Sequence, residues 1–246
     1  MFWNAMGAPA VFYNGTIKKI PAMRSLYLLV DGATILVPIL FSFHKKIRFD
    51  RTFPAFFRSV TIVAAIFVAW DIAFTRAGVW TFNPKYIMGI YIANLPLEEV
   101  LFFISIPYSC VFTYYSLNKF YDLTWDPRIA NIVSITLSMG LGTIAFVYSH
   151  RLYTTVTLTA TAVVILLLQF AGRPGSFGRL VTVYLVLLIP FFIVNGILTG
   201  TGPAEPVVLY NNGENLHIRL LTIPVEDLFY GFTLVGLNVF CYERLR

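Results

Sequence analysis

The chain has 246 residues, of which 58% are hydrophobic and only 12% are charged. Soluble domains carry roughly 25% charged residues, so this composition excludes an ordinary soluble domain and predicts an all-α integral membrane protein. The net charge of +6 does not predict a nucleic-acid partner, because the basic residues lie in short loops that flank apolar runs, as in membrane proteins.

Seven apolar stretches predict about seven transmembrane helices, since roughly 20 helical residues cross a hydrocarbon layer about 30 Å thick. Residues 1–22 hold no continuous apolar segment of their own, so we expect an N-terminal extension and not a signal peptide. In chain order, the predicted helices cover residues 25–43, 57–76, 97–117, 129–149, 153–171, 180–199 and 223–243.

The distribution of Lys and Arg predicts the direction in which the chain crosses the membrane. The predicted loops on one side, together with the C-terminus, contain 11 of the 18 basic residues, and the opposite side contains seven. The positive-inside rule therefore places the N-terminus outside and the C-terminus in the cytoplasm of a multi-pass protein of the cell membrane.

An internal repeat is visible in the sequence. Residues 95–102 (LPLEEVLF) match residues 223–230 (IPVEDLFY), and residues 111–114 match residues 239–242 at the same offset of 128. We therefore expect a first repeat over 23–126 and a second over 127–246. The repeated segments lie four spans apart, so they are predicted to run parallel, with an axis along the membrane normal between them.

Four acidic residues occupy the first turns of two otherwise apolar helices: Glu98, Glu99, Glu226 and Asp227. Acids at a helix N-terminus also have a purely structural explanation in the helix dipole. Their recurrence in both halves favours a functional reading, because ionisable residues within a membrane are costly.

Neighbouring residues on a helix point about 100° apart, so one acid of each pair is expected to face the opposite half. We expect these to be Glu98 and Glu226, the identical members. Two carboxyl groups that face each other in a poor solvent share one proton. The pair would then combine an acid and a base.

Further polar and aromatic residues accompany these acids. With a four-residue gap, Asp71 aligns with Asn195, and both are expected either to hydrogen-bond between helices or to take part in the site. Arg219 is expected to pair with one of the acids. Aromatic rings near the acids are candidates for stabilising a cation through their π faces.

No metal or dinucleotide site is predicted. The three histidines, His44, His150 and His217, lie in separate loops, and no Gly-x-Gly-x-x-Gly follows a strand. We therefore expect neither a metal nor another cofactor.

Three segments carry a resemblance to a known family: residues 70–80 (WDIAFTRAGVW), 89–103 (GIYIANLPLEEVLFF) and 211–227 (NNGENLHIRLLTIPVED). In these segments the chain resembles the membrane-integral lycopene cyclases, and it looks like the form in which two bacterial subunits are fused. It is also similar to the cyclase part of the fungal bifunctional lycopene cyclase/phytoene synthases. The likeness extends from about residue 23 to the C-terminus.

The resemblance implies a lycopene β-cyclase, an isomerase that closes the ψ end groups of lycopene into β-ionone rings in carotenoid biosynthesis. Lycopene and the lipid bilayer are then the expected partners, together with other enzymes of the carotenoid pathway. The four acids are the expected catalytic residues. The residues expected to contact substrate are Asp71, Trp70, Trp80, Tyr91, Phe102, Asn195, Asn215, Arg219 and Tyr230.

The main alternative is a proton-coupled membrane transporter, since duplicated halves with buried acids also describe that class. A membrane prenyltransferase would need Asp-rich motifs that bind Mg²⁺ and diphosphate, and the chain has none. A structural protein would not need repeated acids inside the membrane.

Overall fold

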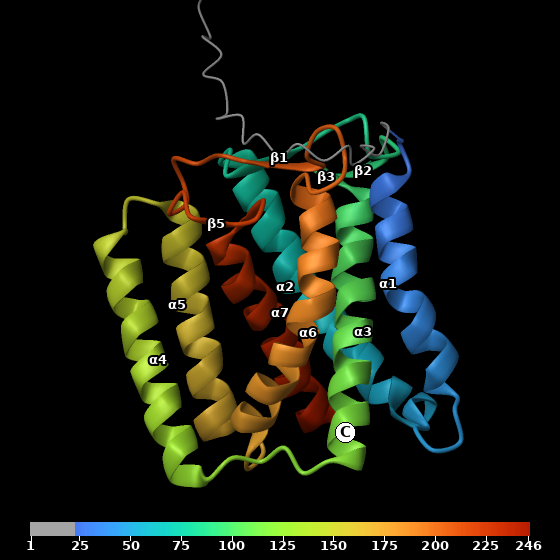
Figure 1. The fold of residues 1–246 in the computed structure, drawn as a ribbon, viewed down its shortest axis with the longest axis vertical. Helices are drawn as coiled ribbons and strands as arrows, with labels where there is room; N and C mark the ends of the chain where they lie inside the picture. The colour runs from blue at the N-terminus through green and yellow to red at the C-terminus, as the bar shows by residue number, and fades with distance from the viewer. Residues whose placement is uncertain (1–22) are drawn as a thin grey trace, which may run out of the picture.

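The computed structural model describes residues 23–246, so the predicted extension over residues 1–22 lies outside the described part of the chain. Seven helices cross the molecule side by side, and the short strands gather at one end (Figure 1). The helices are α1 (Leu26–Ser42), α2 (Phe53–Arg76), α3 (Leu97–Phe120), α4 (Pro127–Val147), α5 (Leu152–Leu166), α6 (Ser176–Thr199) and α7 (Val225–Leu245).

The predicted membrane architecture is confirmed, with helix ends within a few residues of those expected. Two short helical turns adjoin the main helices: η1 (Phe49–Thr52) precedes α2, and η2 (Leu167–Ala171) continues α5 in a π-helical turn. Five of the resulting segments are long and apolar enough to cross a bilayer. Helix α1 is apolar but has only 17 residues, and α7 has 21 residues with charged side chains near both ends.

Local sequence signals explain several helix boundaries. The Asp126 side chain caps α4 by accepting hydrogen bonds from two backbone N–H groups, and Pro127 fills the first helical position, where no N–H is needed. Gly175 and Gly200 flank α6 with φ of 78° and 113°, values that favour glycine.

Six short strands, which the sequence did not predict, cover the end of the bundle at which α3 and α7 begin. Strands β2 (Tyr91–Ile92) and β3 (Leu95–Pro96) form a hairpin before α3. Strands β5 (Arg219–Leu220) and β6 (Ile223–Pro224) form the matching hairpin before α7. Strand β1 (Trp80–Phe82) pairs antiparallel with β4 (Val208–Tyr210) and joins the two halves of the chain.

The pairing of β1 with β4 is symmetric about its centre. Trp80 pairs with Tyr210, and Phe82 pairs with Val208. Residues 80 and 82 correspond to 208 and 210 at the offset of 128. Each end residue of β1 therefore pairs with the counterpart of the residue at the other end of β1. A two-fold interface has this property, and the pseudo-two-fold axis therefore passes through the middle of the pair.

The hairpins repeat in backbone detail. Gly89 and His217, 128 positions apart, both have positive φ, and so do Ala93 and Leu221. A positive φ is uncommon outside glycine, so its recurrence at matched positions shows that both halves keep one loop conformation. The internal duplication is therefore confirmed in the fold as well as in the sequence.

The helices correspond in the same way: α1 with α5, α2 with α6, and α3 with α7. Helix α4 packs mainly on α5 and has no counterpart in the first half. The division into 23–126 and 127–246 stays a prediction, in which α4 would belong to the second repeat.

The two halves do not pack on each other equally. Helix α2 of the first half packs closely on α7, whereas its counterpart α6 makes far fewer contacts with α3. The space left between α6 and α3 is where the main cavity of the molecule lies.

The fold predicts that the strand end and the C-terminal end face opposite sides of the membrane. In a background with Cys110 and Cys241 replaced by alanine, we expect a membrane-impermeant maleimide added to intact cells to label Ala204→Cys, which is exposed between α6 and β4 at the strand end. Lys46→Cys and Arg173→Cys, at the other end, should react only after the membrane is opened. Labelling of all three positions in intact cells would contradict the seven-span arrangement.

Candidate functional site

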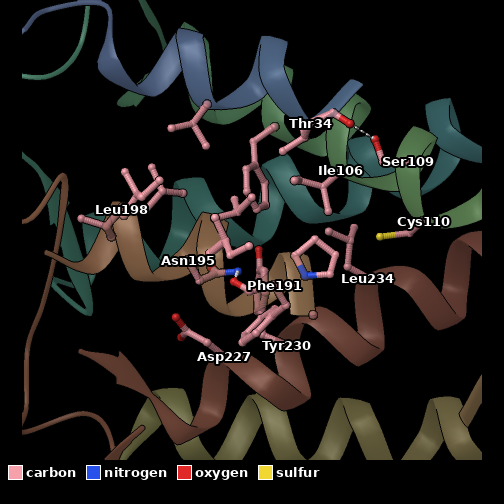
Figure 2. Close-up of a pocket in the computed structure, with 18 of the residues that line it drawn as sticks. Thr34, Ile106, Ser109, Cys110, Phe191, Asn195, Leu198, Asp227, Tyr230 and Leu234 are labelled. Atoms are coloured by element: carbon pink, nitrogen blue, oxygen red, sulfur yellow. Dashed lines mark hydrogen bonds between the residues drawn. The ribbon is translucent and has the colours of Figure 1, made fainter. Parts of the chain in front are cut away.

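A largely apolar cavity of about 490 Å³ lies between the two halves of the chain. Helices α1 and α3 line one side of it, and α6 and α7 line the other (Figure 2). Strands β1 and β4 cover its end through Trp80, Phe82, Val208 and Tyr210. Three acidic side chains and no Lys, Arg or His are among the described residues that line it. Pockets of this size commonly hold small molecules.

One acid from each repeated pair lines the cavity, but not the one that we expected. Glu99 on α3 and Asp227 on α7 are lining residues, whereas Glu98 and Glu226 are not. The expectation that Glu98 and Glu226 face each other across the two halves is therefore wrong.

Glu98 and Glu226 instead tie the hairpins to the helices that follow. Oε1 of Glu98 accepts a hydrogen bond from the Met88 N–H at 2.6 Å, and Oε1 of Glu226 accepts one from the Leu216 N–H at 2.7 Å. Residues 88 and 216 are equivalent at the offset of 128. Both acids are fully buried, so each supplies an acceptor that the incoming loop would otherwise lack.

Tyrosine hydroxyl groups donate to both Glu99 and Asp227. Tyr27 on α1 donates to Glu99 at 2.6 Å. Tyr153 on α5 and Tyr210 on β4 donate to the two oxygens of Asp227, at 2.5 and 2.9 Å. Burial and the neighbouring Asp227 carboxyl raise the pKa of Tyr210 well above its usual range, so Tyr210 remains a neutral donor at physiological pH.

The third acid of the cavity is Asp71 on α2, which connects the two halves. It accepts a hydrogen bond from the Tyr230 hydroxyl on α7 at 2.7 Å, and it lines the same cavity as Glu99. Asn195, its counterpart on α6, also lines the cavity but donates only to the Phe191 carbonyl of its own helix. The two halves therefore share the framework of the site but differ in its chemistry.

Three of the five aromatic residues expected at the site line the cavity: Trp80, Phe102 and Tyr230. Trp70 does not line the cavity, and its ring stacks on Phe67 and makes a T-shaped contact with Tyr230. Tyr91 lies in β2 with 50% of its surface exposed and does not line the cavity, so its expected substrate contact is not supported.

The two polar loop residues expected to contact substrate also lie outside the cavity. Asn215 is buried and accepts a hydrogen bond from the His217 N–H at 2.8 Å. Arg219 donates to the Thr222 carbonyl and to the Asn212 side chain, and its guanidinium lies 5.8 Å from the centre of the Tyr210 ring. It forms no ion pair with an acid in the described structure, so the expected pairing is wrong.

Sequence reasoning missed the tyrosine donors Tyr27, Tyr153 and Tyr210. Tyr27 and Tyr153 both begin helices that are equivalent in the two halves, but at an offset of 126 and not 128. A search that allowed a two-residue gap would have paired them.

Across residues 23–246, no cluster of His, Cys, Asp and Glu is arranged to hold a metal ion. What the site presents is proton donors and acceptors: three carboxyl groups, tyrosine hydroxyls that orient them, and aromatic faces. Such a set can donate a proton to an apolar molecule and take one back.

Comparison with known proteins identifies the family. The sequence profile described as "Lycopene cyclase" matches residues 24–117 and 150–245. A bifunctional lycopene cyclase/phytoene synthase of Colletotrichum graminicola is 34% identical over 80 residues, which are 32% of this chain and 13% of that protein. The protein of the same name from Pyrenophora tritici-repentis is 35% identical over 60 residues, which are 24% of this chain and 10% of that protein.

These matched segments are short relative to the curated relatives, of which the chain covers about a tenth. No solved structure matches the chain significantly. The family profile nevertheless covers most of the chain, in two segments that each contain one of the paired acid motifs. The chain belongs to the lycopene cyclase family.

Proposed function

We propose that the protein is a lycopene β-cyclase, an isomerase that converts the ψ end groups of lycopene into β-ionone rings, giving γ-carotene and then β-carotene. The observation that carries this proposal is the cavity, in which three carboxyl groups meet a long apolar space with no basic residue among its described lining. An apolar polyene fits such a space, and the acids supply the proton chemistry that its cyclisation needs.

The reaction has no net change in atoms or electrons. A proton adds to the terminal double bond of the end group and leaves a tertiary cation. The next double bond attacks this cation, so that a carbon–carbon bond closes the ring. The ring then loses a proton, which restores a double bond. One group must therefore give a proton, another must accept one, and the positive charge between the two steps must be stabilised.

The pair of Asp71 and Glu99 is the proposed proton donor. Two carboxyl groups that line one apolar cavity without a basic residue among its described lining cannot easily both be ionised, so we assign a proton to this pair. The hydroxyl groups of Tyr230 and Tyr27 hydrogen-bond to Asp71 and Glu99 respectively and fix the orientation in which the proton faces the cavity.

Asp227 is the proposed base. It accepts two tyrosine hydrogen bonds, which stabilise its ionised form. A carboxylate here would also balance the charge of the cation. The rings of its donors Tyr153 and Tyr210 stack on each other, and the Trp80 ring packs against both at the wall of the same cavity. Each aromatic face that the cation meets contributes about 0.5–2 kcal/mol.

The substrate is proposed to come from the bilayer of the cell membrane, in which lycopene dissolves. Other enzymes of the carotenoid pathway are the proposed neighbours that make lycopene and use the cyclic product. Neither a cofactor nor a metal is part of the proposal, because each step is a proton transfer or a rearrangement of carbon–carbon bonds.

Expression in cells that accumulate lycopene tests the proposal directly. We expect the red pigment to be replaced by orange-yellow β-carotene or γ-carotene, measured by chromatography of the extracted carotenoids. Unchanged lycopene in cells whose membranes contain the folded protein would exclude the cyclase and leave the transporter as the main alternative.

Substitutions at the acids separate the reacting groups from those that hold the fold. Asp71→Asn, Glu99→Gln and Asp227→Asn should each lower turnover by about 10²–10⁴-fold, the usual contribution of general acid–base catalysis. Turnover is measured per folded protein with lycopene in proteoliposomes.

The matched controls are Glu98→Gln and Glu226→Gln, which keep an oxygen that accepts from the hairpin N–H. They should retain most of the turnover. Glu98→Ala should instead lower the unfolding free energy by about 1–3 kcal/mol, because a buried N–H loses its partner. If Glu98→Gln proved as inactive as Glu99→Gln, the assignment of Glu98 to the framework would be wrong.

A further inference from the structure

The cavity lies on one side of the pseudo-two-fold axis and has no equal on the other side. Under the two-fold relation, the α3–α6 interface corresponds to the α7–α2 interface. The second is closely packed, whereas the first is held apart by the cavity. A duplicated protein with two equivalent halves would have two such cavities, so something in the sequence of the halves must differ.

Two pairs of equivalent residues account for the difference. Trp70 on α2 packs against Tyr230 of α7 across the closed interface, and Phe103 on α3 packs against Phe67 of α2 within the first half. Their counterparts in the second half are Val194 on α6 and Gly231 on α7, and both line the cavity. Small residues of the second half therefore line the cavity at positions where the first half has a tryptophan and a phenylalanine.

The cavity opens sideways toward the surface of the bundle that faces lipid. Val37 on α1 and Ile193 on α6 both line the cavity, yet they are 58% and 60% exposed. Both lie well inside their helices, at a depth within the membrane. Helix α1 packs closely on α3 but makes few contacts with α6. We call the opening between Val37 and Ile193 the mouth.

The acids lie toward one end of a long space. Lining residues on α3 run from Glu99 to Thr113, which is about 21 Å along the helix at 1.5 Å per residue. Asp227 and Asn195 lie toward one end of this space in Figure 2, and Cys110 lies toward the other. The chain thus offers one acid centre, with an elongated apolar path that leads away from it.

We propose that this cavity takes one end group of its substrate at a time, admitted from the lipid through the mouth, and that Val194 and Gly231 keep it open. The proposal rests on the proposed cyclase function. The two ends of linear lycopene lie at opposite extremes of the molecule and cannot both reach one acid centre. Formation of two rings therefore requires that the monocyclic product leave the cavity, turn round in the bilayer and bind again.

A pulse-chase experiment tests the release step. Isotopically labelled lycopene is given to the protein in proteoliposomes, and a large excess of unlabelled lycopene is added when monocyclic product has formed. We expect the label to remain mostly in monocyclic carotene, with at least a tenfold drop in labelled bicyclic product. A yield of labelled bicyclic product that the chase leaves unchanged would overturn the proposal, whereas no cyclisation in any sample would instead refute the cyclase function.

Variants test the residues that keep the cavity open. A Cβ atom at position 231 would lie 2.9 Å from the Tyr184 hydroxyl and 3.3 Å from the Phe191 ring, so Gly231→Phe should fill the cavity. We expect cyclisation to fall at least tenfold while the protein keeps its detergent-extracted melting transition. Val194→Trp provides a second filling variant should Gly231→Phe fail to fold.

The control is Gly32→Phe on α1, at an exposed position where a Cβ atom would meet no atom within 4 Å. It adds the same ring outside the cavity and should leave cyclisation unchanged. Full activity in both folded filling variants would show that substrate does not use this cavity, even if the protein is a cyclase.

Discussion

The structure depends on keeping three carboxyl groups inside an apolar cavity without a basic partner among its described residues. A buried carboxyl group is costly unless hydrogen bonds compensate for the water that it loses. Here tyrosine hydroxyls from α1, α5, α7 and β4 supply those bonds to Glu99, Asp227 and Asp71. Because these donors come from helices in both halves, the halves must be fixed precisely relative to each other, and the paired strands β1 and β4 fix them at the end nearest the acids.

The residues that the two halves share form that framework, and the residues in which the halves differ lie around the cavity. The features that the two halves share hold the chain in place: the hairpins, their positive-φ residues and the bonds made by Glu98 and Glu226. The features in which they differ surround the cavity: Asp71 against Asn195, Tyr230 against Phe102, and Gly231 against Phe103. Of the two equivalent interfaces, α3 with α6 leaves the space of the cavity, whereas α2 with α7 is closely packed.

This pattern explains which predictions from the sequence succeeded. The helices were predictable because their lengths follow from the thickness of the bilayer. The pairing of acids was also predictable, but Glu98 and Glu226, the members expected to face the opposite half, do not line the cavity. The identical members make the same hairpin bond in both halves, and the members that line the cavity, Glu99 and Asp227, are those that had diverged. The strands escaped prediction because two or three residues of pairing leave no periodic pattern to detect.

Helix α4 determines whether the two repeated units cross the membrane in the same direction. Each repeated unit contains three helices, an odd number, so two units joined directly would cross the membrane in opposite senses. Inverted repeats of this kind are common in transporters. One additional crossing restores the sense of the second unit, and only then can β1 and β4 meet on the same side. The helix that contributes no residue to the lining of the cavity is therefore the one that allows all the acids to gather at a single depth. A chain without it would have its paired motifs on opposite faces of the membrane.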